Sequence, residues 1–150
     1  MVDELIIRKA ESKDLVHILR LLYELGRPRP KSDKEADVFE NIIKQHIADV
    51  GKEIIVTQVG SKIVGVAILN FLTRVNRTTS ELYIPELIVQ EDYRNMGIGE
   101  KLITKCIEYA KKNNCYRLRL ESGTERKESH KFYKKVGFKQ SALTFTLDIV

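Results

Sequence analysis

The residue types and spacing best suited to chemistry lie where an apolar run at 86–89 leads into Arg94-Asn95-Met96-Gly97-Ile98-Gly99 and then an amphipathic stretch. Two glycines at a strand-to-helix turn let successive backbone N–H groups point at one anion, and the helix dipole adds to the attraction. Glycine also lets a phosphate approach the backbone, because no Cβ stands in the way. The segment is therefore typical of a pyrophosphate cradle; a turn that requires glycine for its own geometry is the alternative interpretation.

Other phosphate and metal sites are not supported by the spacing. A dinucleotide fingerprint needs a third glycine three residues after Gly99, where Leu102 stands. A Walker loop needs Gly-Lys-Ser or Gly-Lys-Thr, and the sequence contains neither, so NAD and ATP are not favoured. Cys106 and Cys115 match no zinc spacing and the three histidines lie far apart, so no metal site is expected. Cys106 is expected to be a buried structural thiol.

Composition limits the class of protein. A chain of 150 residues has the size of one domain, 1–150, and 43% hydrophobic residues can form a real core. The 26 basic against 21 acidic residues give +5, which suits either an anionic partner or a solvated surface. Scattered basic residues and the lack of Trp argue against nucleic acid. We expect no membrane segment and no signal peptide, and hence a cytoplasmic protein.

Hydrophobic periodicity predicts the elements that must position this chemistry. Strands are expected at 5–10, 53–59, 62–72, 81–90 and 116–120, with one or two more in 138–150. Helices are expected within 12–25, 32–50, 98–114 and 129–136. Pro85 interrupts the strand 81–90, and because proline has no N–H for the ladder it predicts a bulge. The order β-α-α-β-β-β-α-β-α-β-β indicates a single α/β (α+β) domain with four helices and a mixed sheet of six to seven strands.

Two motifs resemble a known family. Arg94 to Gly99 is similar to the Q/R-x-x-G-x-G/A signature of the GNAT superfamily of N-acetyltransferases, and Phe132-Tyr133-Lys134-Lys135-Val136-Gly137-Phe138 is similar to its F-Y-x-x-x-G-F segment. The run from Arg126 to Tyr133 resembles the R-x-x-A-H-x-F-Y pattern of a small-molecule branch that includes the aminoalkylphosphonate N-acetyltransferases. The resemblance implies the GNAT fold, with its central strands splayed, and acetyl-CoA as the co-substrate.

The resemblance also implies roles for individual residues. The backbone of the strand 87–89 would pair with the pantetheine arm, and the amides of residues 95–100 would hold the pyrophosphate. The cofactor-binding set is then Leu87, Ile88, Val89, Arg94, Asn95, Met96, Gly97, Ile98, Gly99 and Glu100. A backbone N–H near Ile88 would stabilise the oxyanion.

Two residues match catalytic positions of the family. Glu86 would accept the proton of the attacking amine, directly or through water, and Tyr133 would protonate the leaving thiolate. A core tyrosine is the alternative for Tyr133. His130 could be a second base or a substrate ligand, with a surface histidine as the alternative. Arg126 stands where many members carry an asparagine that contacts the cofactor.

The acceptor is less well defined. In the family, the loop between the first two helices lines the acceptor site, and here it carries Arg27 and Arg29. These cations would suit a phosphonate, phosphate or carboxylate, or simply lie in solvent. The leading hypothesis is acetyl transfer from acetyl-CoA to a primary amine of a small molecule by direct attack on the thioester. The alternatives are a protein N-terminal or lysine acetyltransferase and a non-catalytic acyl-CoA-binding module. A homodimer is a further expectation, by analogy with the family.

Overall fold

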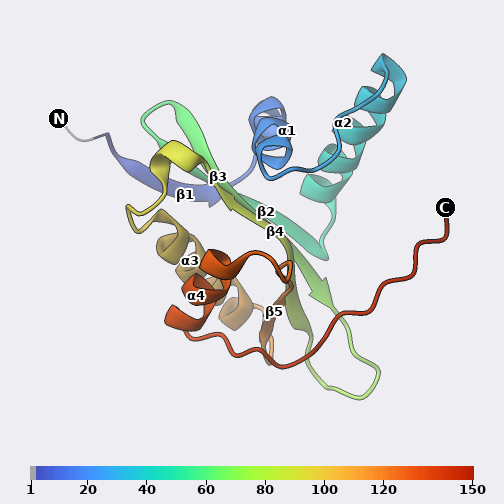
Figure 1. Ribbon diagram of the computed structural model, residues 1–150, viewed down its shortest axis with the longest axis vertical. Helices are drawn as coiled ribbons and strands as arrows, with labels where there is room; N and C mark the ends of the chain where they lie inside the picture. The colour runs from blue at the N-terminus through green and yellow to red at the C-terminus, as the bar shows by residue number, and fades with distance from the viewer. Residues whose placement is uncertain (1–2) are drawn as a thin grey trace. The chain divides into compact units, whose positions relative to one another are not determined.

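The computed structural model describes residues 3–150. The chain divides into two compact units, one up to Arg119 and one from Leu120 onward. The strands, labelled in Figure 1, are β1 (Leu5–Lys9), β2 (Lys52–Val59), β3 (Lys62–Leu72), β4 (Glu81–Val89) and β5 (Leu118–Leu120). The helices are α1 (Leu15–Glu24), α2 (Asp33–Ala48), α3 (Ile98–Lys112) and α4 (Lys127–Lys135), with short 3-10 turns η1 (Ser12–Asp14) and η2 (Glu91–Tyr93).

The strands form one sheet in the order β1-β2-β3-β4-β5. The first four are antiparallel to their neighbours. Between β4 and β5, Tyr116 N–H donates to Ser80 C=O and Leu82 N–H donates to Arg117 C=O, each at 3.0 Å. From the first bond to the second, the residue numbers increase on both segments, as they do in a parallel pair. The sheet is therefore mixed, and the predicted α/β class is confirmed, with five strands in place of six or seven.

Helices cover both faces of the sheet (Figure 1). On one face, α1 and α2 bury an aliphatic cluster against β2, β3 and β4: Leu15, Ile18, Leu21, Ile43, Ile54, Val56, Val66, Ile68 and Ile88. On the other, α3 buries Ile98, Leu102, Ile103, Cys106 and Ala110. The predicted structural role of Cys106 is confirmed, because it is fully buried and burial raises its thiol pKa to about 12. No described helix has the length and apolar character needed to cross a membrane.

Strand β4 contains the predicted bulge. Asn70 lies opposite Tyr83 and Ile68 lies opposite Glu86, so three steps on β4 match two on β3. The extra residue falls at Ile84-Pro85, where proline cannot donate to the ladder. Residues directly opposite in an antiparallel pair project from the same face. The bulge therefore places Glu86 on the same face as Tyr83, the face that carries α1 and α2.

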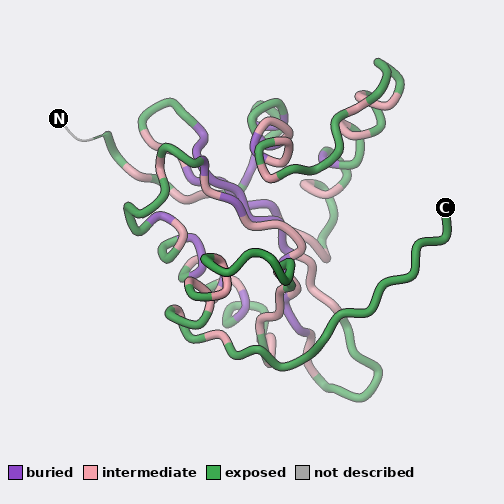
Figure 2. Tube along the Cα trace, in the orientation of Figure 1, coloured by how far each residue is buried: buried purple, intermediate pink, exposed green. Residues whose placement is uncertain are grey.

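The expected strands in 138–150 are not formed, and this prediction is wrong. The segment has no helix or strand after α4, and residues 139–150 are exposed along their length (Figure 2). Its alternating apolar side chains, Leu143, Phe145, Leu147 and Ile149, are 74–89% exposed. Alternation indicates that a segment can form a strand, but a strand forms only where a neighbour accepts its backbone hydrogen bonds.

Candidate active site

The predicted cradle lies where β4 passes through η2 into α3. Asn95 and Gly97 both have left-handed backbones, with φ of 61° and 79°. Gly97 is the N-cap of α3 and supplies no side-chain cap, and the first helical bond runs from Lys101 N–H to Gly97 C=O. The N–H groups of the first turn therefore have no carbonyl partner within the helix. Left-handed turns that aim successive amides outward, followed by a positive helix end, form a binding site for an anion.

The space in front of this turn is open. A Cβ built on Gly97 would meet no atom within 4 Å. Met96 beside it is 64% exposed. Arg94 Nε donates to the carbonyl of Val89 at 2.9 Å. Arg94 thus ties the loop between β4 and α3 to the end of β4.

Alternate residues of β4 direct their backbone N–H and C=O groups away from β3, toward the other edge of the strand. Gln90 N–H donates to Val64 C=O at 2.7 Å, so the pair 90–64 is hydrogen-bonded across β4 and β3. Because hydrogen-bonded pairs alternate in an antiparallel ladder, the backbone of Ile88 faces β3, and those of Leu87 and Val89 face the opposite edge. The Arg94 bond to Val89 C=O agrees with this assignment. An amide near Ile88 that faces away from β3 therefore belongs to Leu87 or Val89.

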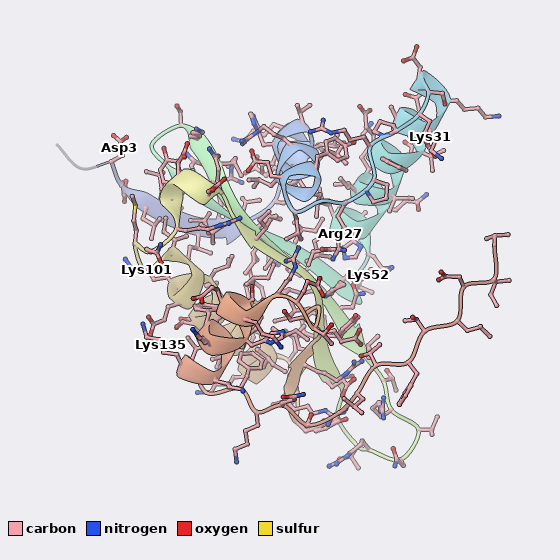
Figure 3. The ribbon with its side chains drawn as sticks, in the orientation of Figure 1. Asp3, Arg27, Lys31, Lys52, Lys101 and Lys135 are labelled. Atoms are coloured by element: carbon pink, nitrogen blue, oxygen red, sulfur yellow. The ribbon has the colours of Figure 1, made fainter. Side chains whose placement is uncertain are left out.

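Glu86 is paired with a residue of the loop between α1 and α2. Arg27, labelled in Figure 3, donates from Nε and Nη2 to Glu86 Oε2 at 2.9 and 2.8 Å. The Glu86 side chain is 20% exposed and that of Arg27 is 49% exposed. The structure thus brings together two of the residues predicted from sequence. Glu86 was predicted to take the proton of the amine, and Arg27 was predicted to bind the molecule that receives the acetyl group. The contact is possible because the bulge turns Glu86 toward the α1–α2 face.

Arg29 lies elsewhere on the same loop. Its guanidinium stacks on the ring of Tyr23 at 4.9 Å from the centroid, on a surface hollow between α1 and α2 that Leu19 also lines. Arg29 is therefore not joined to Glu86 as Arg27 is. The two arginines that the sequence grouped together have different partners.

In the second unit, the end of α4 fixes Tyr133. Phe138 N–H donates to Tyr133 C=O at 2.9 Å, and Gly137 N–H donates to Lys134 C=O at 3.2 Å. With Gly137 at φ 107°, these bonds form a Schellman motif, in which an apolar contact accompanies the left-handed residue. Here that contact joins the rings of Tyr133 and Phe138, 5.7 Å apart and edge-on. The spacing of the F-Y-x-x-x-G-F segment is thus the spacing of a helix cap that orients the tyrosine ring.

His130 lies one turn before Tyr133 and closes the loop that precedes α4. Its Nε2 lies 2.8 Å from the carbonyl oxygen of Gly123. A carbonyl only accepts, so Nε2 is the donor in this contact, and Nδ1 is the nitrogen left for another partner. His130, for which the sequence left open a second base, a substrate ligand or a surface histidine, thus uses one ring nitrogen to hold the loop 123–130.

A buried carboxylate was missed by sequence reasoning. Glu81, at the start of β4, is fully buried and accepts hydrogen bonds from Arg117 Nε at 2.8 Å, Arg119 Nε at 3.0 Å and Tyr116 Oη at 3.1 Å. Burial opposes its ionisation, but these hydrogen bonds outweigh burial and lower the pKa of Glu81 to about 2. The available signal was the Arg-x-Arg spacing at 117 and 119, which places both side chains on one face of a strand.

The comparisons with known proteins identify the family. The sequence model of the Acetyltransferase (GNAT) family matches residues 14–138, and the chain belongs to this family. It is an N-acetyltransferase, and acetyltransferases of the GNAT fold use acetyl-CoA.

Named relatives include small-molecule enzymes. Glucosamine 6-phosphate N-acetyltransferase of Trypanosoma brucei brucei is 28% identical, over 99% of this chain and 98% of its own. Aminoalkylphosphonate N-acetyltransferase of Salmonella typhimurium is 24% identical, over 93% and 88%. A match of 46% identity to an uncharacterised N-acetyltransferase of Methanocaldococcus jannaschii covers 38% of this chain and only 25% of that longer protein. Among solved structures, an acetyltransferase of Trypanosoma brucei has a TM-score of 0.80 and 30% identity, over 97% of this chain and 100% of its own.

Proposed function

We propose that this chain transfers an acetyl group from acetyl-CoA to a primary amine of a small molecule. The observation that carries the proposal is the position of Glu86, turned by the bulge toward the α1–α2 loop and held there by Arg27. A carboxylate in that position suits the removal of a proton from an ammonium, which must occur before the amine can attack.

Acetyl-CoA would be held by the backbone around the β4–α3 turn. Its pyrophosphate fits the amides of residues 95–100, because the first turn of α3 has no side-chain cap and the space before Gly97 is open. The outward amides and carbonyls of Leu87 and Val89 suit pairing with the pantetheine arm. Acetyl-CoA would supply the thioester carbonyl that the amine attacks.

The proton transfers would fall to two side chains. A free alkylamine has a pKa of about 10.4, so a group must take its proton near neutral pH, and Glu86 would do so directly or through water. As the C–N bond forms and the C–S bond breaks, the Tyr133 hydroxyl would protonate the thiolate. An outward amide of Leu87 or Val89 would stabilise the oxyanion.

The acceptor would be a small molecule that carries an anionic group. The two full-length relatives named above for small substrates both act, by their names, on amines that carry a phosphate or a phosphonate. Arg27, which already holds a carboxylate, has the fork geometry that binds such groups. His130 would contact the acceptor through Nδ1, and Arg29 would do so from the hollow beside Tyr23.

We also propose that the two units form one acetyltransferase domain, because the family match runs across their boundary at residues 119–120. The exposed alternating apolar side chains of 143–149 favour a homodimer, in which they would be covered by a second copy. Light scattering would test this by giving twice the chain mass. A cytoplasmic location remains a proposal that fractionation would test.

The experiment is the release of free CoA thiol from acetyl-CoA with a panel of amines, against an amine-free blank. The panel holds aminoalkylphosphonates, amino sugars and their phosphates, polyamines, aminoglycosides and short peptides. Turnover of short amines supports the proposal. Turnover of peptides alone would replace it with a protein acetyltransferase, and acetyl-CoA binding without any turnover would replace it with a binding module.

A further inference from the structure

Four arginines gather around the single carboxylate of Glu81. Arg117 and Arg119 donate to it, and Arg74 Nη1 lies 3.8 Å from its Oε1. Arg77 reaches the same cluster through Tyr116, which donates to Glu81. We call these four arginines the arginine cluster. They come from the β3–β4 connection and from the start of β5, two segments separated by some forty residues of sequence.

The charges of this group do not balance. Glu81 keeps its negative charge at neutral pH, because its pKa is about 2. Four guanidinium groups remain charged at any physiological pH. One buried negative charge therefore faces four positive charges, and the side chains of Arg74 and Arg117 reach the surface, where they are 47% and 44% exposed. Such a concentration of one sign attracts anions.

Aromatic rings hold the guanidinium groups in place. Tyr116 has Arg77 at 4.3 Å and Arg117 at 5.4 Å from its ring centroid, and Tyr83 has Arg119 at 4.5 Å. Stacking on a ring restricts the long arginine side chain and leaves the edge of its planar fork able to donate. The bond from Arg117 to Glu81 uses Nε, and the guanidinium of Arg117 carries further N–H donors. The cluster is thus organised before any ligand arrives.

The arginine cluster lies on the same face of the sheet as Glu86. Glu81, Tyr83 and Glu86 lie opposite Leu72, Asn70 and Ile68, which share one face of β3. At about 3.3 Å per residue, the five steps from Glu81 to Glu86, one of them in the bulge, span roughly 13–16 Å. An anion on the cluster then lies on the order of 10–15 Å from the carboxylate of Glu86.

We propose that Arg74, Arg77, Arg117 and Arg119 bind the anionic group of an elongated acceptor whose amine lies at Glu86. The inference rests on the proposed function and specifies its substrate: an amine separated from a phosphate, phosphonate or carboxylate by a chain of about ten atoms. Arg27 would bind an anionic group next to the reacting amine, whereas the arginine cluster would bind an anionic group at the opposite end of the acceptor. A short amine would occupy only the first of these positions.

The first test measures binding without turnover. Titration of inorganic phosphate into the full chain, with the arginine Nε–H signals followed by NMR, should shift the signals of Arg74, Arg77, Arg117 and Arg119 as a group. The Arg77→Gln variant should weaken this binding about tenfold, the value of one lost charge-assisted bond. Lys44→Gln is the matched control, since Lys44 is an exposed cation on α2. No shift, or shifts unaltered by Arg77→Gln, would overturn the site whatever the enzyme's activity.

The second test measures acceptor length. In the CoA-release assay, ω-aminoalkyl phosphates with 2 to 12 methylenes are compared with alkylamines and ω-amino carboxylates of equal length. We expect the ratio of kcat/KM for phosphate over alkylamine to be highest near 8–10 methylenes and to fall about tenfold there in Arg77→Gln, but not in Lys44→Gln. A ratio independent of length, or equally affected in both variants, would contradict the proposal. If no amine is turned over, the proposed function fails, and the phosphate titration still decides the site. The carboxylate series shows which anion the cluster prefers.

Discussion

Arg27 and Glu86 lie 59 positions apart in the sequence and meet through two hydrogen bonds, both to Glu86 Oε2, at 2.9 and 2.8 Å. The guanidinium thereby fixes the orientation of a carboxylate that we assign to proton transfer. An anionic group on an incoming acceptor would compete with Glu86 for Arg27. Entry of the substrate would then release the carboxylate that has to accept a proton from it.

Replacing the carboxylate tests that assignment. Glu86→Gln should lower kcat by about 10²–10³-fold, because the amide cannot take a proton, while acetyl-CoA binding stays close to that of the native chain. Steady-state thiol release and isothermal titration with acetyl-CoA measure the two quantities. Asp37→Asn, which removes one exposed carboxylate from α2, is the control. An equal kcat in Glu86→Gln and the native chain, under conditions limited by chemistry, would remove Glu86 from the role.

Tyr133→Phe should lower kcat by about 10²–10⁴-fold. Phenylalanine preserves the ring contact with Phe138 and leaves the backbone cap of α4 intact. Single-turnover kinetics isolate the chemical step, and thermal unfolding checks the fold. Tyr109→Phe on α3 is a matched control. If both variants react as fast as the native chain, Tyr133 is a packing residue and not the acid.

Alanine variants of two glycines with left-handed backbones distinguish a loss of stability from a loss of acetyl-CoA binding. Gly97 and Gly26 have φ of 79° and 92°, and a Cβ on either meets nothing within 4 Å. Alanine at either position should cost about 1–2 kcal/mol of stability, because L-residues resist the left-handed region. Only Gly97→Ala should also weaken acetyl-CoA binding, by about 10–100-fold, since its methyl group occupies the cradle. Similar acetyl-CoA affinities in the two variants would place the phosphates elsewhere.

The buried Glu81 makes stability depend on acid pH. Its pKa falls from 4.5 to about 2 on folding, so its contribution is complete above pH 4.5 and is lost as pH falls toward 2. At neutral pH this contribution is on the order of 3 kcal/mol. Glu81→Gln should therefore unfold at a lower temperature than the native chain near pH 6, and the difference should shrink steadily between pH 4.5 and 2. A difference in Tm that does not change with pH would show that Glu81 acts through packing alone.

Local signals in the sequence were reliable where the physics is local. Gly137 ends α4 through a backbone geometry that glycine adopts readily, and Pro85 marks the bulge because it cannot donate a hydrogen bond. Contacts between distant segments could not be predicted. Arg27 and Glu86 are brought together by the loop after α1 and the bulge jointly, and neither element specifies the pair alone.

Sequence reasoning missed the buried carboxylate Glu81 and predicted strands in 138–150 that are not formed. These two errors have related causes. Glu81 at the start of an apolar strand gives no sign of the arginines that surround it, because those residues lie on other segments. The alternation at 143–149 is a sound strand pattern, yet a pattern cannot say whether a neighbouring strand exists. Sequence reasoning describes what a segment can do, whereas its partners decide what it does.

The bulge at Pro85 also has a genetic consequence. Deletion of this one codon would remove the extra residue, so that Tyr83 and Glu86 would lie two positions apart and still project from the same face of the sheet. Glu86 would therefore keep its place on the α1–α2 face. Deletion of codon 87 would instead move Ile88, which is buried in the α1–α2 cluster, to the opposite face. Of the three-base deletions open to β4, the one at codon 85 should thus be among the best tolerated, as a deletion scan scored for soluble expression would reveal.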